Sequence, residues 1–331
     1  MKILVPVVGF GKEGGYRVLS RLASMWSIAG HAVDFLVDGR ATTPYFPTAA
    51  TIRRYSTDGT ILDGPPPAVS GFDSSGNSAG IYMGMWRALE KIGHAYDVIL
   101  ANYSLTSFPI ALSRTRHAAK FYYVQAYEPE YFSAQSGWKA RVLQLLSSLS
   151  YRLPLKQIAN SPIYLKHHNI KADSWIPPGI DEALYFRRQS PPSIAPGRPL
   201  ILGTIGRREP AKGTVYALEA FSSLAEGDAQ ISLKIAYGNA PDGWNHPRAE
   251  VVTPENDAQL ADFYRSIDIL LAPGTVQHGA PHYPVLEAMA CGTPVVTTGY
   301  LPANAENAWI TENRNSASIA DAVNDIRTLS P

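Results

Sequence analysis

The sequence of 331 residues contains a single cysteine, Cys291, so no disulfide can form within the chain. Such scarcity of cysteine is typical of proteins from a reducing compartment. The chain also lacks an excess of charge, because its 29 lysine and arginine residues are matched by 28 aspartate and glutamate residues. This balance gives no electrostatic basis for binding nucleic acid. No apolar run reaches the roughly 18–20 residues of a membrane span.

The apolar run at the N-terminus is too short, and too interrupted by glycine, to predict a signal peptide. We therefore expect a cytoplasmic protein, and we leave open a peripheral association with the inner face of the cytoplasmic membrane. The composition, 45% hydrophobic and 17% charged, is that of a globular protein, and the length suits two domains.

Short apolar runs alternate with segments of helical periodicity along the whole chain. One such helix is predicted near residues 257–267, and another over 105–116 with Pro109 in its first turn. Apolar strands followed by helices indicate parallel sheets covered on both faces. The pattern restarts after the proline- and serine-rich stretch RRQSPPSIAPGRP, residues 187–199, which predicts a linker.

The predicted fold class is therefore α/β, with two Rossmann-like domains whose parallel sheets face each other across an interdomain cleft. We place the domains at residues 1–187 and 188–331. In such folds ligands bind outside the carboxyl ends of the strands.

A glycine-rich stretch, GFGKEGG, follows the first apolar run. Its Gly9, Gly11 and Gly14 match the G-x-G-x-x-G pattern of dinucleotide-binding turns, and Asp34 or Asp38 could supply the acid about 20 residues on. A nicotinamide enzyme is thus one hypothesis. It gives no role to the cationic and glycine-rich segments of the second half.

The most specific of those segments is APGTVQHGAPHYPVLEAMACGTPVVTTG, residues 272–299. Pro284 suits the first position of a helix and Gly292 the position just past its end. The N-terminus of this short helix would attract an anion. Glu287, expected in the first turn, has two interpretations: it complements the helix dipole, or it accepts hydrogen bonds from ribose hydroxyls.

A second segment, GTIGRREPAKGT, covers residues 203–214. Its spacing is not that of a Walker A loop. Arg207 and Lys212 follow a predicted strand and precede a predicted helix, where they could clamp a diphosphate. The alternative is a solvated basic turn with Glu209 as a surface partner.

Four motifs together resemble glycosyltransferase family 4, which consists of retaining enzymes with the GT-B fold. Along the chain they are IANSPIYLK, WIPPGIDEALYF, IGRREPAKG and LEAMACGTPVVTT. The corresponding elements of the family follow one another in the same order. The resemblance implies transfer of a hexose from a nucleotide-diphosphate sugar to a glycan or lipid-linked acceptor, in cell-surface polysaccharide biosynthesis. It implies no cofactor and no metal, and it leaves the oligomeric state open.

The resemblance also assigns roles to individual residues. It implies that Arg207 and Lys212 bind the donor diphosphate and that Glu287 binds the nucleotide ribose, and these three form the predicted catalytic set. The predicted donor-binding set adds Gly206, Tyr237, Gly238, His282, Tyr283, Pro284 and Val285. The predicted acceptor-binding set is Gly14, Gly15, Gln125 and Glu128.

One position departs from the family's Glu-x7-Glu pattern, because Gly279 stands where the first glutamate is expected. His278, His282 or backbone amides of the loop could replace that acid. The elements VQAYEP and YPVLE resemble a branch of rhamnan-synthesis transferases, which makes a deoxyhexose donor a hypothesis. Two further alternatives are a redox or epimerase enzyme and a nucleotide-sugar binding protein that has lost turnover.

Overall fold

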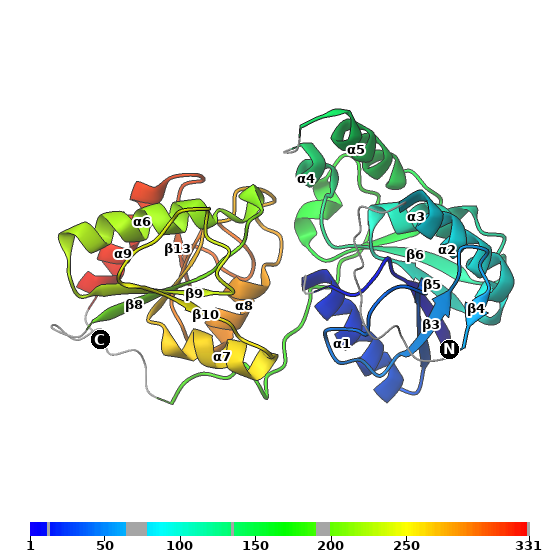
Figure 1. The fold of residues 1–331 in the computed structure, drawn as a ribbon, viewed down its shortest axis with the longest axis horizontal. Coiled ribbons are helices and arrows are strands. Elements are labelled where there is room, and N and C mark those ends of the chain that lie inside the picture. Colours follow the sequence, from blue (N-terminus) through cyan, green and yellow to red (C-terminus); the bar gives the residue numbers. More distant parts are fainter. Residues whose placement is uncertain (12–13, 64–77, 134–135, 190–198, 330–331) are drawn as a thin grey trace. The chain divides into compact units, whose positions relative to one another are not determined.

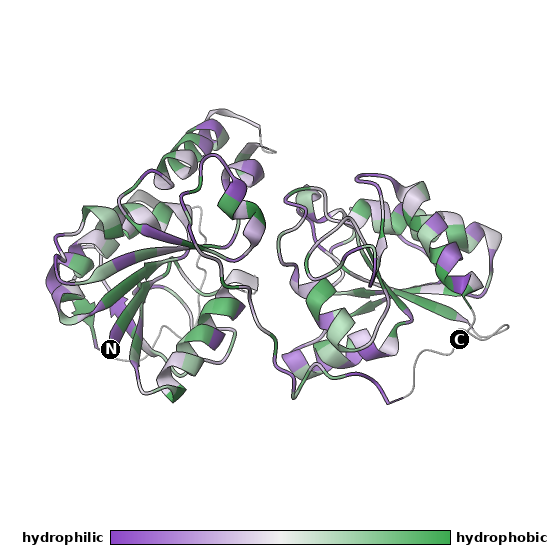
Figure 2. Cartoon of the chain, turned by 180° about the vertical axis from the view of Figure 1, so that it is seen from behind, coloured by the Kyte–Doolittle hydropathy of each residue, from purple (hydrophilic) through white to green (hydrophobic). Residues whose placement is uncertain are grey.

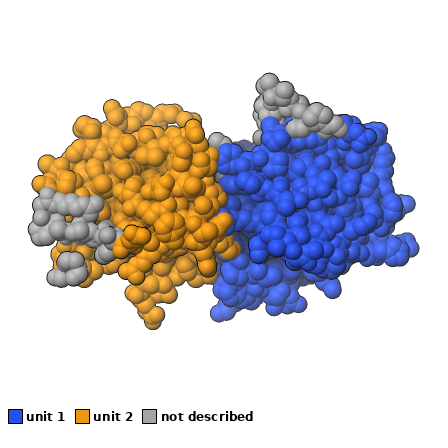
Figure 3. Space-filling model, turned by 90° about the horizontal axis from the view of Figure 1, so that it is seen from below, with its two compact units in different colours: residues 1–178 blue, residues 179–331 orange. Residues whose placement is uncertain are grey.

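The computed structural model divides the chain into two compact units, residues 1–178 and 179–331, which Figure 3 colours separately. Each unit is built on one sheet (Figure 1), and hydrophobic stretches run through the strands of both sheets (Figure 2). The predicted α/β class and the two Rossmann-like sheets are confirmed. The structure describes residues 1–11, 14–63, 78–133, 136–189 and 199–329.

The sheet of the first unit has the strand order β4-β3-β2-β1-β5-β6-β7. Its pairs are parallel except that β3 and β4 pair antiparallel. Strand β4 lies at the edge and β3 lies between β4 and β2. Neither strand was expected, because β4 has only two residues and β3 reads TIRRY, which mixes charged with apolar residues. The strands are β1 Lys2–Pro6, β2 Ala32–Asp38, β3 Thr51–Tyr55, β4 Ile61–Leu62, β5 Val98–Ala101, β6 Ala119–Val124 and β7 Lys156–Ala159.

Helices α1 and α3 lie on opposite faces of this sheet (Figure 1). Helix α3 starts at Ser104 and Pro109 is its sixth residue, so the prediction that Pro109 lies in the first turn is wrong. A full turn precedes the proline, and it begins where the Ser104 amide donates to the Glu128 carboxylate at 3.1 Å. The helices are α1 Gly14–Ile28, α2 Ser78–Ile92, α3 Ser104–Leu112, α4 Pro129–Ser133 and α5 Trp138–Ser150, with 3₁₀ turns at Gly93–Ala95 and Pro162–Lys166.

The sheet of the second unit has the order β10-β9-β8-β11-β12-β13, with parallel pairing throughout the part described. Its strands are β8 Leu200–Ile205, β9 Ile231–Ala236, β10 Ala249–Val252, β11 Ile269–Ala272, β12 Val295–Thr297 and β13 Trp309–Ile310. Its helices are α6 Thr214–Gly227, α7 Asp257–Ser266, α8 Tyr283–Ala290 and α9 Ser316–Thr328, with a 3₁₀ turn at Pro210–Lys212.

Successive residues of β11 face two separate cores. Ile269 and Leu271 pack with α6 and α9, whereas Leu270 and Ala272 pack with α7 and α8. This alternation follows from the two-residue period of a strand. A strand buried on both faces must be apolar at every position, which is why the parallel sheet could be predicted.

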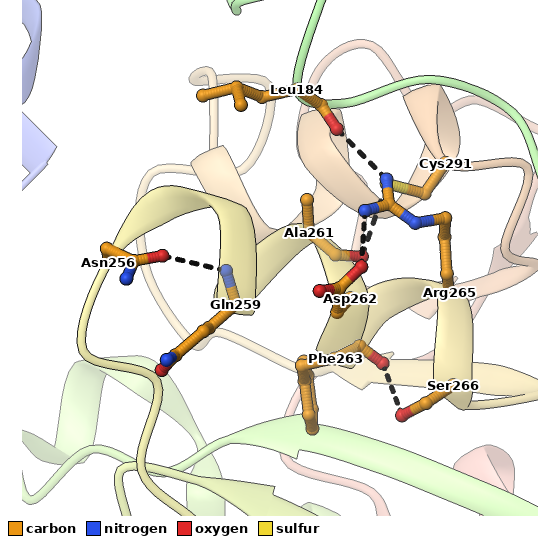
Figure 4. A network of polar contacts seen from close by, with 9 residues as sticks. All are labelled: Leu184, Asn256, Gln259, Ala261, Asp262, Phe263, Arg265, Ser266 and Cys291. Carbon is orange, nitrogen blue, oxygen red and sulfur yellow. Dashed lines mark hydrogen bonds and ion pairs between the residues drawn. The ribbon is translucent and has the colours of Figure 1, made fainter.

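The boundary between the units lies at 178/179, whereas the sequence prediction put it at 187/188. Residues after 178 pack on the second unit: Tyr185 is buried in the α7–α8 core, and the Arg188 guanidinium donates to Ile267 O at 2.9 Å. Arg265 of α7 donates to Leu184 O at 2.9 Å (Figure 4). Composition alone did not reveal these anchors, since the predicted linker was recognised only by proline and serine.

Truncating Tyr185 tests this attachment. Tyr185→Ala leaves a cavity in the α7–α8 core, and we expect it to lower the free energy of unfolding by about 3–5 kcal/mol. The matched control is its half-exposed neighbour, Phe186→Ala, which loses only surface contact with Arg265. Denaturant titration measures both variants. Equal losses would show that residues 179–188 are not part of the core of the second unit.

Candidate active site

The two segments singled out in the second half meet at the carboxyl ends of neighbouring strands. Strand β8 leads into the loop with Arg207 and Lys212, and β11, which pairs with β8, leads into the loop before α8. The two loops are joined directly, because the Thr275 amide donates to Ala211 O at 2.9 Å. The sequence placed each segment at a strand end, and the structure brings them together.

Gly213 shows how closely these loops approach. Its φ of +69° is a left-handed conformation, and a Cβ atom there would lie 1.8 Å from Pro273 O. Only glycine fits such a position. The loop is closed from within by Thr214, whose hydroxyl accepts from the Arg207 amide at 3.0 Å and donates to Arg207 O at 2.9 Å.

The third strand end at this edge is that of β9. Tyr237, Gly238 and Asn239 follow it with φ values of 66°, 63° and 56°. A Cβ at Gly206 would lie 1.5 Å from Gly238 O. The side-chain amide of Asn239 donates through Nδ2 to Gly206 O at 3.2 Å. The predicted donor-binding residues Gly206, Tyr237 and Gly238 therefore come together beside the cationic loop.

Three basic side chains gather at this edge. Burial lowers the pKa of His282 well below its ordinary value, and the charges of Lys212 and Arg207 lower it further. The pKa of Lys212 is lowered by burial and by Arg207, with Glu209 opposing the shift. His282 is therefore neutral near pH 7. Mutual repulsion between two cations at one place creates an electrostatic preference for an anion.

Helix α8 starts at Tyr283, with Pro284 at its second position and His282 as its N-cap residue. Its eight residues and the left-handed Gly292 just beyond agree with the predicted two-turn helix. The helix places Val285 in the core, where it is fully buried.

Glu287 is the fifth residue of this helix, whereas the sequence predicts it in the first turn. The dipole interpretation is weakened, because that effect falls off within the first turn. Glu287 is also buried, and the Tyr264 hydroxyl donates to its Oε2 at 2.8 Å. A buried carboxylate held by a hydroxyl is a fixed hydrogen-bond acceptor.

The loop that lacks the family's first glutamate explains that absence physically. Gly279 has a φ of +85°, which a glutamate would adopt only with strain, and its backbone N–H donates to Gly299 O at 2.7 Å. Nε2 of His278 lies 3.1 Å from Gly274 O, within hydrogen-bond distance. His282 differs, because its buried Nδ1 has no hydrogen-bond partner in the described part of the chain.

In the first unit the predicted acceptor residues also meet. Gly14 and Gly15 open α1, and the Gln125 side chain donates to Gly15 O at 3.4 Å. Glu128 accepts from the Ser104 amide with both oxygens at 3.1 Å and from the Tyr122 hydroxyl at 3.4 Å. Burial nevertheless raises the pKa of Glu128 to about 7.

Tyrosines around Glu128 were missed by the sequence analysis. Burial raises the pKa values of Tyr82 and Tyr103, and the charge of Glu128 and the nearby Tyr16 add to both shifts. These residues come from separate segments of the chain, so no local motif joins them. The one available signal was the total of 18 tyrosines.

The two acids required by the nicotinamide hypothesis are engaged elsewhere. Asp34 accepts hydrogen bonds from Arg53 and Tyr96, and Asp38 pairs with Arg40 at 2.7 Å. Neither is presented to a ribose. Cys291 is buried with its thiol pKa raised to about 11, in agreement with an inert cysteine.

Comparison with known proteins gives the class. Several solved glycosyltransferases share the fold over nearly the whole chain: WaaG of lipopolysaccharide biosynthesis (TM-score 0.64, 17% identity, 99% of this chain and 91% of that one) and TarM (TM-score 0.68, 11% identity, 98% and 91%). The chain thus has the GT-B fold. Residues 199–328 match the family model for glycosyl transferases group 1, so the second unit is a domain of that family.

Two curated proteins are also similar in sequence. The chain is 27% identical to the O-antigen biosynthesis protein RfbC of Myxococcus xanthus over 234 residues, 69% of this chain but only 17% of that protein. It is 24% identical to a D-inositol 3-phosphate glycosyltransferase of Corynebacterium efficiens over 356 aligned residues, 95% of this chain and 82% of that one. The prediction of a glycosyltransferase domain in the second half of the chain is confirmed.

The raised pKa of Glu128 predicts a pH dependence of stability. Its folded pKa of about 7 exceeds the ordinary 4.5, so the folded state holds the extra proton between these values. Stability is therefore greatest below pH 4.5 for this group and is lost as the pH rises through 7, by about 1–3 kcal/mol.

Denaturant titrations at several pH values measure the effect. Glu128→Gln should flatten the decline between pH 5 and 7, while Glu219→Gln, which changes an exposed glutamate of α6, should leave it as in the wild type. A Glu128→Gln profile parallel to the wild type would contradict the assignment.

Proposed function

We propose that the protein transfers a hexosyl group, with retention of configuration, from a nucleotide-diphosphate sugar to a hydroxyl of a glycan or lipid-linked acceptor. The observation that carries the proposal is the joining of the β8 and β11 loops, which sets Arg207, Lys212 and His282 together beside the start of α8. The process would belong to cell-surface polysaccharide synthesis, in the cytoplasm and at the inner face of the membrane.

The diphosphate is assigned to the cations. Arg207 and Lys212 repel each other when nothing lies between them, and a diphosphate removes that cost while it accepts charge-assisted hydrogen bonds. The amides at the start of α8 have no partner within the helix and favour the same anion. In the reaction these groups stabilise the leaving diphosphate as positive charge grows on the sugar. A solved complex of TarM contains UDP, which supports this donor class.

The ribose is assigned to Glu287. Its carboxyl group accepts a hydrogen bond from the Tyr264 hydroxyl at 2.8 Å, which orients it as an acceptor. The sugar is assigned to His282 in place of the missing acid at Gly279, because His278 is engaged with Gly274 whereas Nδ1 of His282 is not satisfied. A neutral imidazole can donate to or accept from a sugar hydroxyl.

The acceptor is assigned to the first unit, at Gly14, Gly15, Gln125 and Glu128. The tyrosines near Glu128 provide the apolar faces and hydroxyls that suit a sugar ring. The chemistry is proposed to need no metal ion and no cofactor, since the leaving group is neutralised by cationic side chains.

Removing one cation tests the diphosphate assignment. Lys212→Ala and Arg207→Ala should each reduce donor use by about tenfold to a hundredfold, the equivalent of about 1.5–3 kcal/mol for a charge-assisted hydrogen bond. The measurement is nucleotide-sugar turnover in the presence of EDTA. Arg208→Ala is the matched control, because Arg208 is exposed beside the same loop.

Wild-type turnover in both test variants would remove the diphosphate assignment. An equal loss in Arg208→Ala would show a general charge effect and not a bound diphosphate. Activity lost in EDTA and restored by one divalent ion would overturn the metal-free mechanism.

Glu287 is tested by exchanging its carboxylate for an amide. Glu287→Gln should weaken nucleotide binding by about 1.5–3 kcal/mol, because an acceptor oxygen for the ribose becomes a donor. Tyr264→Phe is the comparison, since it removes the partner of Glu287 but not the carboxylate. It should lower the melting temperature and change nucleotide affinity less. Nucleotide titration and thermal melts separate the two effects.

If Glu287→Gln melts earlier but binds nucleotide as the wild type does, Glu287 is a structural residue. The ribose assignment would then be withdrawn.

A further inference from the structure

Helix α5 of the first unit has an inverted distribution of side chains. It buries small residues against the domain, namely Ala140, Ser147 and Ser150. It exposes large apolar residues, namely Trp138, Val142, Leu145, Leu146 and Leu149. Trp138 is 72% exposed and Leu145 60%. A helix that served only the core would present these faces the other way round.

The exposed residues form a continuous stripe. Trp138, Val142, Leu145 and Leu149 are spaced by four, three and four residues. At about 100° per residue they lie within roughly 60° of arc on the helix. The buried residues lie on the opposite side. The chain therefore presents a row of large apolar side chains along the full length of the helix.

The charge around the stripe is of one sign. Helix α5 carries Lys139 and Arg141 and no acidic residue, and Lys139 lies 5.9 Å from the centre of the Trp138 ring. From residue 131 to residue 172 the sequence has no aspartate or glutamate, although acids and bases balance over the whole chain. The cations of this stretch are all exposed: Lys139, Arg141, Arg152, Lys156, Lys166 and Lys171.

We propose that α5 docks the protein on an anionic lipid surface. The stripe would enter the boundary between headgroups and acyl chains, while the lysine and arginine side chains reach the phosphates. Tryptophan beside a cation is typical of that boundary. None of the helices in the described ranges is long and apolar enough to cross a membrane, so α5 lies on the surface. The proposal does not depend on the transferase activity.

Vesicle binding tests the proposal directly. The full-length protein should sediment with vesicles of phosphatidylcholine and phosphatidylglycerol, and less with phosphatidylcholine alone or at high salt. Leu145→Gln should weaken binding about tenfold, since one large apolar side chain no longer enters the bilayer. The matched control is Leu112→Gln, because Leu112 is 68% exposed at the end of α3 in the same unit. That variant should bind as the wild type does.

A second measurement locates the helix. Brominated lipids should quench part of the tryptophan fluorescence, and Trp138→Phe should remove most of that quenching. Lys139→Gln should weaken binding to anionic vesicles about fivefold and leave the weak binding to neutral vesicles unchanged. Nucleotide affinity should be the same in all of these variants, so failure here is distinguishable from failure of the transferase assignment.

Three outcomes would overturn the proposal. The wild type could fail to bind anionic vesicles. Leu112→Gln could lose binding as much as Leu145→Gln does. The protein could instead self-associate through the stripe, shown by a concentration-dependent mass that Leu145→Gln abolishes without any vesicle binding.

Discussion

The active-site arrangement of the second unit depends on one contact between two loops. The amide of Thr275 bonds Ala211 O, and Gly213 lies against Pro273 O at a distance that no side chain permits. Without this contact the β8 loop and the α8 loop would be two separate turns at the end of a sheet. With it they form one rigid surface. The parallel pairing of β8 and β11 is what allows the contact, because it sets both loops at the same edge.

The position of the loops matters because they carry like charges. Arg207 contributes to the lowered pKa of Lys212, so the fold holds two cations where they repel each other. In the proposed function, a bound diphosphate would relieve this repulsion, which is the advantage of a preorganised site over flexible cations in solution.

Much of the fold followed from the sequence, because the strands of parallel sheets are apolar throughout and their helices are periodic. Strand β3 and the edge strand β4 did not, since β4 has only two residues and TIRRY of β3 has no clear period. Glu287 lies one residue further into its helix than the sequence predicts, because helix α8 includes Tyr283 before Pro284.

In the second unit, short motifs placed the segments of Arg207 and Glu287 each after a strand, and the structure brings these two segments together. Contacts between distant segments were beyond reach, as with Glu128 and Ser104, which are 24 residues apart. The same holds for the unsatisfied Nδ1 of His282. Burial and partner are properties of packing, and no local pattern encodes them. Helix α5 was predicted as a helix, but its exposed face could be recognised only when the buried face was known.

The left-handed turn at Gly279 has a consequence for any redesign of this loop. A glutamate placed there would have to adopt a φ of +85°, which only glycine takes without strain, so an acid restored at this position would weaken the turn that carries it. His282 has an extended backbone with a φ of −128°, which any side chain adopts. An acid introduced at His282 would leave the fold of the loop undisturbed.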